Sequence, residues 1–386
     1  LQVLTHTVES LRDTAFDRLE AVQDSRAAAV ERYLSETALT PDNMVPGGPV
    51  NRAMSEIVRS RTGLGETGET YLAEEIGGRI EFRSDMVTMG GGDFVFGYDV
   101  TDIAPAYLTS ALDGEEARSV YTDSSGTLVM VVFEQLDVPG RNWAMVTKMN
   151  LEEAVDPELE GEEGDFFTNY MEELGYYDLF LIHPEGEVFY TVEKEADLGT
   201  NIIDGVYSDS SLGEAVREAI SNQDLGFGDF APYAPSGGVP ASFVAEPVVT
   251  GNTVELIVAL QMPLDEINAV MQGRSGMGET GETYLVGPDY LMRSDSYLDP
   301  EDHSVAASFA NPETGDVRTY AAEEALAGRM GAQTITDYLG SEVLSAYRPV
   351  NVYDTQWALL GEMDIDEVSQ PVVTLVTGIV IAGLVI

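Results

Sequence analysis

The chain has 386 residues, and its 68 acidic residues outnumber its 19 basic residues to give a formal net charge of −49. This charge repels phosphate backbones, so nucleic acid is excluded as a partner, and the absence of cysteine excludes disulfides and thiolate metal ligands. The carboxylates are spread along the whole sequence, and 44% of the residues are hydrophobic. This pattern indicates a folded protein from a halophile, with an acidic cation-storage protein as the alternative.

A long helix is predicted at the N-terminus, over residues 1–40. Neither proline nor glycine occurs from Leu1 to Glu36, and apolar residues recur every seven positions in the first half. A seven-residue spacing of apolar residues is typical of a coiled coil, and further along the segment the apolar residues follow the pattern of an ordinary amphipathic helix. We therefore expect this helix to form a homodimer. The proline- and glycine-containing segment 41–62 is predicted to be a linker.

A short motif occurs twice, as GLGETGETYL at 63–72 and GMGETGETYL at 276–285. Both copies contain G-x-G-x-x-G, the pattern of a dinucleotide-binding turn. That turn requires a buried strand before the glycines and a helix directly after them. Here a polar, helix-like segment precedes the first copy, and a strand–turn–strand pattern follows the second. The motif therefore marks an internal repeat and not a nucleotide site.

The repeat extends over complete units of similar length. Trp143 and Trp357 lie at nearly the same distance after the two motifs, and each begins an apolar, strand-like run that leads into an acidic segment. Equal spacing over a whole unit is stronger evidence than the motif alone. We predict a first module over 63–155 and a third module over 276–368.

A more divergent second module is predicted over 176–270, after a linker helix over 156–175. Its opening, YDLFLIHPEGEVFYTV, has two apolar runs around a Pro-Glu-Gly-Glu turn, which indicates a hairpin. Its closing segment, QMPLDEI, corresponds to the acidic closures of the other two modules. The sequence thus predicts an α+β fold with a long helix followed by three antiparallel sheets with flanking helices.

None of the sixteen residues of the C-terminal segment 371–386 is charged. As a helix it is too short to cross a hydrocarbon core of about 30 Å, so we expect it to be the start of a transmembrane span. A buried terminal helix or strand is the alternative interpretation.

These features resemble the extracytoplasmic region of Cache-type methyl-accepting chemotaxis receptors. The most specific segments are GETGETYLVGPDYLMRSDS (278–296), DLFLIHPEGEVFYTVEKEADLGTN (178–201) and WALLGEMDIDEV (357–368). The resemblance implies PAS-like modules beside a long helix, placement outside the cytoplasm, and attachment to the cell membrane through the C-terminal helix. It also implies a small-molecule ligand of the organic acid or amino acid class. The family usually carries two modules and three are predicted here, so the resemblance leaves open which module binds.

Candidate ligand contacts come from the PAS-like arrangement, in which the pocket lies between the sheet and its covering loops. We predict binding in the second module, with the outer Arg-Ser-Asp repeats at 83–85 and 293–295 as a second possibility, since an arginine fork holds a carboxylate well. The predicted contacts are Tyr190, Lys194, Asp229, Tyr233, Phe243, Arg293 and Asp295. Each has a structural alternative: ion pairs for Lys194 and the arginines, and turn chemistry for the segment 226–240, which is predicted to be a loop rich in glycine and proline.

The preferred function is a ligand-sensing region that passes a conformational shift to a membrane helix. No nucleophile–base pair, metal-ligand spacing or phosphate loop occurs, so we predict no enzyme activity, no cofactor and no metal site. One alternative is a structural surface or filament protein with the apolar tail in an assembly core. A second is the sensor region of a membrane histidine kinase or cyclase.

Overall fold

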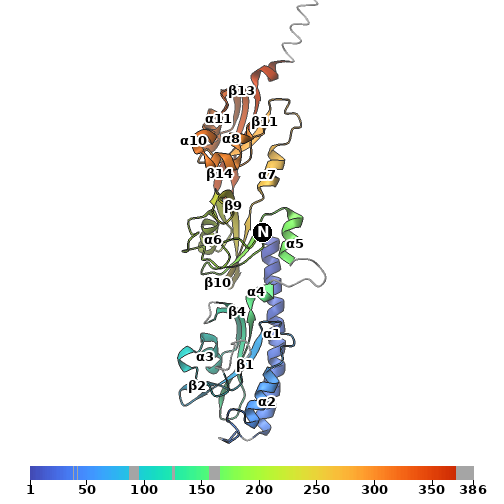
Figure 1. Cartoon of the computed structure of the whole chain (residues 1–386), viewed down its shortest axis with the longest axis vertical. Helices are drawn as coiled ribbons and strands as arrows, with labels where there is room; N and C mark the ends of the chain where they lie inside the picture. The colour runs from blue at the N-terminus through green and yellow to red at the C-terminus, as the bar shows by residue number, and fades with distance from the viewer. Residues whose placement is uncertain (38, 41, 87–94, 124–126, 156–165, 371–386) are drawn as a thin grey trace, which may run out of the picture. The chain divides into compact units, whose positions relative to one another are not determined.

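The computed structural model describes residues 1–37, 39–40, 42–86, 95–123, 127–155 and 166–370. The chain divides into two compact units, a first unit of Gln2–Asn169 and a second unit of Tyr170–Ile386. Figure 1 shows antiparallel sheets flanked by helices in both units and a long helix at the N-terminus, as the sequence predicts.

The first unit contains one five-stranded antiparallel sheet, with the strand order β2-β1-β5-β4-β3. Its helices are α1 (Gln2–Glu36), α2 (Pro49–Val58), η1 (Thr101–Ile103), α3 (Ala106–Leu112) and α4 (Leu151–Val155), and α5 (Phe166–Leu174) crosses the boundary between the units. Its strands are β1 (Glu69–Ile76), β2 (Arg79–Phe82), β3 (Ala117–Thr122), β4 (Leu128–Leu136) and β5 (Asn142–Asn150).

Both faces of this sheet are covered. On one face, Ala27, Val30 and Leu34 of α1 pack with α2 and with Trp143 of β5. On the other face, α3 packs against a second apolar cluster that includes Tyr71. The C-terminal part of the apolar face of α1 is therefore buried inside its own chain, and the predicted homodimer through this helix stays a prediction.

The repeated glycine motif surrounds a glutamate carboxylate. Glu153 accepts hydrogen bonds from the backbone N–H groups of Glu66 (2.5 Å) and Thr67 (2.8 Å), and from the Thr67 hydroxyl. Gly65 has φ +65°, and a Cβ there would lie 1.9 Å from Glu153 Oε1. The glycine is thus required by the close approach of the carboxylate, which ties the start of β1 to the segment after β5.

The second unit contains two further antiparallel sheets. The second sheet has the order β7-β6-β10-β9-β8, and the third has the order β11-β14-β13-β12. The elements of the second sheet are β6 (Leu179–Ile182), β7 (Val188–Thr191), α6 (Ser211–Asn222), β8 (Gly226–Tyr233), β9 (Val239–Thr250), β10 (Thr253–Gln261) and α7 (Leu264–Met271). Those of the third are β11 (Glu282–Val286), α8 (Pro300–His303), α9 (Val305–Ala310), α10 (Pro312–Gly315), α11 (Tyr320–Leu326), β12 (Gly331–Thr336), β13 (Glu342–Val352) and β14 (Thr355–Asp364).

One sequence prediction about the second sheet is wrong. The segment 226–240 is not a single loop, because β8 occupies its first half and only the turn before Val239 is irregular. A Cβ at Gly226 would lie 2.1 Å from the Ala215 carbonyl, and one at Gly228 would lie 1.9 Å from the Ser211 carbonyl. These glycines allow α6 to lie directly against the strand, and they do not form a turn.

The third sheet lacks the second edge strand of the other two sheets. The predicted strand–turn–strand after the second glycine motif is therefore only half correct, since a single bridge between Val286 and Met292 replaces the second strand. The second copy of the glycine motif holds a glutamate carboxylate as the first copy holds Glu153. Glu367 accepts hydrogen bonds from the backbone N–H groups of Glu279 and Thr280, each at 2.8 Å.

Two expectations are not settled by the fold. The segment 371–386 lies outside the described residues, and among the helices that are described none has the length and apolar character needed to span a bilayer. The boundaries of the three modules (63–155, 176–270 and 276–368) stay a prediction, although each range contains one of the three sheets.

Candidate functional site

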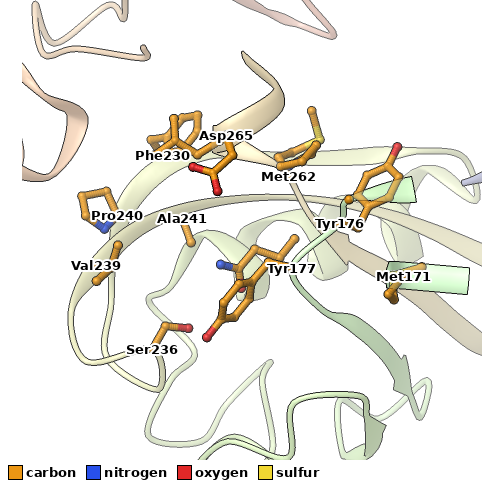
Figure 2. A pocket seen from close by; sticks show the side chains of 14 residues that line it. Met171, Tyr176, Tyr177, Phe230, Ser236, Val239, Pro240, Ala241, Met262 and Asp265 are labelled. Carbon is orange, nitrogen blue, oxygen red and sulfur yellow. The ribbon is translucent and has the colours of Figure 1, made fainter. Parts of the chain in front are cut away.

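A cavity of about 380 Å³ opens at one end of the second sheet (Figure 2). Its walls come from the end of α5 and the residues after it, from β8, from the start of β9, and from the β10–α7 junction. The lining residues are Met171, Gly175, Tyr176, Tyr177, Phe230, Ser236, Val239, Pro240, Ala241, Gln261, Met262, Pro263, Leu264 and Asp265. A mostly apolar lining with a few polar groups is the usual composition of a small-molecule pocket.

Two hydroxyl groups of the lining are oriented by one carboxylate. Ser236 donates to Glu195 Oε2 at 2.6 Å, and Tyr177 donates to Glu195 Oε1 at 3.1 Å. Burial and the neighbouring Glu195 raise the pKa of Tyr177 to about 12, so its hydroxyl stays protonated. Because both hydroxyl protons are used on Glu195, the oxygen lone pairs are left to accept hydrogen bonds from a ligand.

Two further polar side chains belong to the lining, Gln261 and Asp265. Gln261 is only 9% exposed, and its amide oxygen has no hydrogen-bond partner in the described part of the chain. Asp265 places an exposed carboxylate at the same cavity, as Figure 2 shows. None of the 14 lining residues is basic. The lining therefore favours a ligand that donates hydrogen bonds, such as an ammonium group, over an anion.

Two buried carboxylates lie in the same part of the fold. Asp178 accepts from the backbone N–H groups of Leu179 (2.7 Å) and Val192 (2.9 Å), although burial raises its pKa to about 7. Asp197 is fully buried and accepts from the hydroxyl of Tyr233, and burial raises the pKa of Asp197 as well. These groups tie the first hairpin of the second sheet to the loop after it and to β8.

The aromatic candidates from the sequence are core residues. Tyr190 of β7 is 3% exposed, while Phe243 of β9 and Tyr233 of β8 are fully buried. Phe243 and Tyr233 pack against each other with ring centroids 4.8 Å apart. None of the three lines the cavity, and as ligand contacts they stay a prediction.

Lys194, the basic candidate of the second module, also lies away from the cavity lining, and so does Arg217. Lys194 is exposed, in a left-handed backbone conformation with φ 53°. Arg217 of α6 donates to the Ser208 carbonyl at 2.6 Å. An anionic ligand would therefore find no basic side chain among the residues that line this cavity.

Two candidates that the sequence places in different modules bind each other. Arg293 donates to Asp229 Oδ1 from Nε at 2.9 Å and to Oδ2 from Nη2 at 2.8 Å. Its Nη1 lies 3.0 Å from Asp289 Oδ1. Asp295 instead accepts from the Asn268 side chain at 2.9 Å and from the Val305 N–H at 2.7 Å. The guanidinium thus joins the second sheet to the segment after β11.

The equivalent arginine of the first unit is also paired. Arg83 donates to Glu74 Oε2 at 2.5 Å and to Glu81 Oε2 at 2.9 Å. Asp85 accepts from the Phe96 N–H at 3.1 Å. In both copies of the Arg-Ser-Asp segment the arginine is engaged by carboxylates of the chain, which is the structural alternative to ligand binding.

Sequence reasoning missed the residues that do line the cavity. Ser236 belongs to the segment 226–240, in which the sequence analysis selects Asp229 and Tyr233 as ligand contacts and does not select Ser236. Gln261 and Asp265 belong to the closing segment QMPLDEI, which serves there only to align the modules. A polar residue at the last position of an otherwise apolar strand, as in ELIVALQ, is the signal that points to Gln261.

One curated protein is similar to part of this chain in sequence. No protein-family model matches the chain. A segment of 213 residues, 54% of this chain, is 24% identical to the probable chemoreceptor y4sI of Sinorhizobium fredii (strain NBRC 101917 / NGR234). The alignment covers 25% of that protein, so the chain spans about a quarter of the length of the curated relative it matches.

Several solved structures are also similar. The ligand-binding domain of the Pseudomonas fluorescens chemoreceptor CtaA, in complex with L-serine, aligns with 55% of this chain and 80% of its own at 15% identity, with a TM-score of 0.36. The ligand-binding domain of the Pseudomonas aeruginosa PAO1 amino acid chemoreceptor PctC, in complex with GABA, aligns with 50% of this chain and 76% of its own at 14% identity, with a TM-score of 0.35. TM-scores this low support no conclusion about function.

Proposed function

We propose that this chain is the extracytoplasmic, ligand-sensing region of a membrane-bound chemoreceptor. The cavity at the end of the second sheet then binds a small metabolite that carries an ammonium group, of the amino acid or amine class. The observation that carries the proposal is a cavity of ligand size that is lined by the oriented hydroxyls of Tyr177 and Ser236 and by the carboxylate of Asp265, with no basic side chain. The curated relative, a probable chemoreceptor, supports the receptor class.

The organic acid class fits this lining less well. A carboxylate ligand needs a compensating donor or positive charge, because burying an unpaired charge is costly. The lining residues include no lysine, arginine or histidine. An amino acid satisfies the lining through its ammonium group, while its carboxylate stays at the open, solvent-facing side of the cavity.

The relay in this proposal begins at the cavity wall. Phe230 lines the cavity and packs against Trp357 of β14, with ring centroids 6.1 Å apart. Its neighbour Asp229 is held by Arg293. A bulge in the pairing of β8 with β9 between Gly228 and Ala231 contains both residues. Ligand binding then shifts the population of two arrangements of the third sheet relative to the second, and β14 passes the shift towards the C-terminus.

The binding test is calorimetric titration of the whole chain against a panel of amines, amino acids and organic acids. We expect an ammonium-bearing compound to bind, and Gln261→Leu to weaken it about tenfold or more, because a buried acceptor for a charged donor is lost. Ser236→Ala should weaken it as well. Gln333→Leu, on the exposed part of β12, is the matched control and should leave the affinity unchanged.

Two results would count against this assignment. One is binding of organic acids alone with an affinity that Gln261→Leu leaves unchanged. The other is a ligand whose affinity is unchanged by Gln261→Leu and Ser236→Ala but lost on Lys194→Ala, which would return the site to the residues predicted from the sequence.

A further inference from the structure

One face of the third sheet is exposed along β13, an interior strand of that sheet. On the other face α11 packs against β13 and β14, and Tyr320 contacts Tyr347 with ring centroids 6.3 Å apart. Burial alternates strictly along the first part of β13, as it does when only one face of a strand is covered. The exposed residues are Glu342, Leu344, Ala346 and Arg348. We call the face to which they belong the outer face of the third sheet.

The equivalent face of the first sheet is covered. Thr147 of β5 and Gly361 of β14 each follow the tryptophan of their strand by four residues. Val132 of β4 lies opposite Thr147. Ala346 of β13 lies opposite Gly361, so β13 corresponds to β4. From Leu128 to Phe133, β4 is buried on both faces, and α1 packs against it. Within the residues that the structure describes, the third sheet has no such cover along β13.

A hollow of about 490 Å³ lies on the outer face. Ala346 and Gly361 line it, together with Leu359 and with Met330, which is 73% exposed. Small side chains at the middle of a sheet leave room for a larger side chain from a facing layer. Leu344 projects from the same face two residues before Ala346 and is 38% exposed. The face therefore contains both a hollow and an apolar side chain of the size that fills one.

The exposed residues of β13 are complementary to the same residues in reverse order. In chain order they are an acid, a large apolar residue, a small apolar residue and a base. A twofold axis that crosses the strand at Ser345, parallel to the sheet, places Glu342 opposite Arg348 of a second copy and Leu344 opposite its Ala346. The two charges lie about 20 Å apart along the strand, so one ion pair forms at each end. Among the described residues neither Glu342 nor Arg348 has an ion-pair partner.

We propose that two copies of this chain associate through the outer faces of their third sheets. Leu344 of each copy fills the hollow beside Ala346 of the other, and an ion pair between Glu342 and Arg348 closes each end. Such an interface is isologous, so each contact occurs twice, and face-to-face packing of two sheets is a common arrangement. The surface is distinct from the homodimer predicted through α1, and it does not depend on the proposed ligand.

The experiment is sedimentation equilibrium of the whole chain in about 1 M potassium chloride. There the Debye length is about 3 Å, so repulsion between two acidic copies is screened while charges in direct contact still interact. We expect a reversible dimer. Arg348→Glu should raise the Kd of this dimer about tenfold or more, because two glutamates then face each other at both ends of the interface. Glu342→Arg should have the same effect, since it makes two arginines face each other.

The decisive variant combines Glu342→Arg with Arg348→Glu. It exchanges the two charges and should restore the dimer that each single substitution weakens. Leu344→Ser should also weaken the dimer, because it leaves the hollow unfilled. Arg79→Glu is the matched control, since it makes the same change of charge at an exposed position of β2 and should leave the Kd unchanged. All the substituted side chains are exposed, so each variant should keep the wild-type circular dichroism spectrum.

Three results would overturn the proposal. A wild-type chain that stays monomeric at the highest concentration measured would leave the outer face to solvent or to another molecule, such as a helix placed as α1 is on the first sheet. A dimer that Arg348→Glu and Glu342→Arg leave unchanged would form through another surface, such as α1. If both single substitutions weaken the dimer and the combined variant does not restore it, the two charges do not face each other.

Discussion

Arg293 and Asp229 form a two-pronged ion pair although 64 residues separate them, with donor–acceptor distances of 2.9 and 2.8 Å. The arginine side chain is only 2% exposed and lies over the ring of Phe309, 5.1 Å from its centroid. Gly287 leaves room for the guanidinium, since a Cβ there would lie 2.2 Å from its central carbon. The ion pair therefore connects the second sheet to the segment that follows β11.

Removing one partner of this pair should be costly. We expect Arg293→Ala or Asp229→Ala to lower the free energy of unfolding by about 1.5–3 kcal/mol, because each removes a two-pronged hydrogen bond between charged groups. In Asp229→Ala the guanidinium keeps its contact with Asp289. The double variant should lose less than the sum of the two single losses. Urea unfolding of the four proteins measures this coupling.

The matched control is the exposed ion pair of Arg329 and Glu324, with 2.5 Å between Nη2 and Oε1. Arg329→Ala should unfold close to the wild type, because exposed pairs contribute little. Additive losses for Arg293→Ala and Asp229→Ala would show that the two side chains are not energetically coupled.

The sequence predicted the elements whose signals are local. The spacing of Trp143 and Trp357 located β5 and β14, and the run around Pro-Glu-Gly-Glu located the β6–β7 hairpin, which the structure confirms. Apolar alternation and turn residues form patterns over a few positions, so they can be recognised in a single sequence.

What the sequence did not predict depends on contacts between distant segments. The glycine-rich pattern around Gly226 and Gly228 predicts a loop for Asp229, whereas both glycines lie in β8 and accommodate α6. Its partner Arg293 lies in the segment after β11, and no local pattern relates the two. The cavity residues were missed for the same reason, since Tyr177, Ser236 and Gln261 meet only through the packing of three separate strands and loops.

Gly228→Ala tests the explanation given for the glycines of β8. The added methyl group meets the Ser211 carbonyl of α6 at 1.9 Å, so helix and strand must separate. We expect a loss of about 1–3 kcal/mol or more in the free energy of unfolding. Gly273→Ala is the control, because its nearest contact is an ordinary 3.4 Å to the Val270 carbonyl. An equal response of both variants to urea would contradict the close-approach explanation.

The glutamate held by the first glycine motif should give a pH-dependent contribution to stability. Although burial opposes it, hydrogen bonds from Thr67 and from the Glu66 N–H lower the pKa of Glu153 below its ordinary 4.5. The stabilisation is therefore present above about pH 4.5 and is lost as the pH falls through the folded-state pKa. Glu153→Gln should cost about 1–3 kcal/mol at neutral pH, as expected for hydrogen bonds to a charged group.

The measurement is urea unfolding of wild type and Glu153→Gln at several pH values. The difference between the two proteins should stay constant from pH 7 down to about pH 4.5 and should shrink as the pH is lowered further, through the lowered pKa of Glu153. Glu56→Gln, at an exposed position of α2, should differ little from wild type at any pH. A difference for Glu153→Gln that grows on acidification would have the wrong sign for this interpretation.

Salt should stabilise the protein through screening of its charges. At a net charge of −49, self-repulsion opposes the compact state, and it weakens as the Debye length falls from about 10 Å at 0.1 M to about 3 Å at 1 M. We expect the unfolding midpoint to rise between about 0.1 M and about 3 M potassium chloride, with most of the rise below about 1 M, where the Debye length changes most. The same rise should occur in N-methyl-D-glucamine chloride, because screening does not require that the cation enter the fold. A midpoint that stays level or falls in both salts would contradict the adaptation to high salt that the composition indicates.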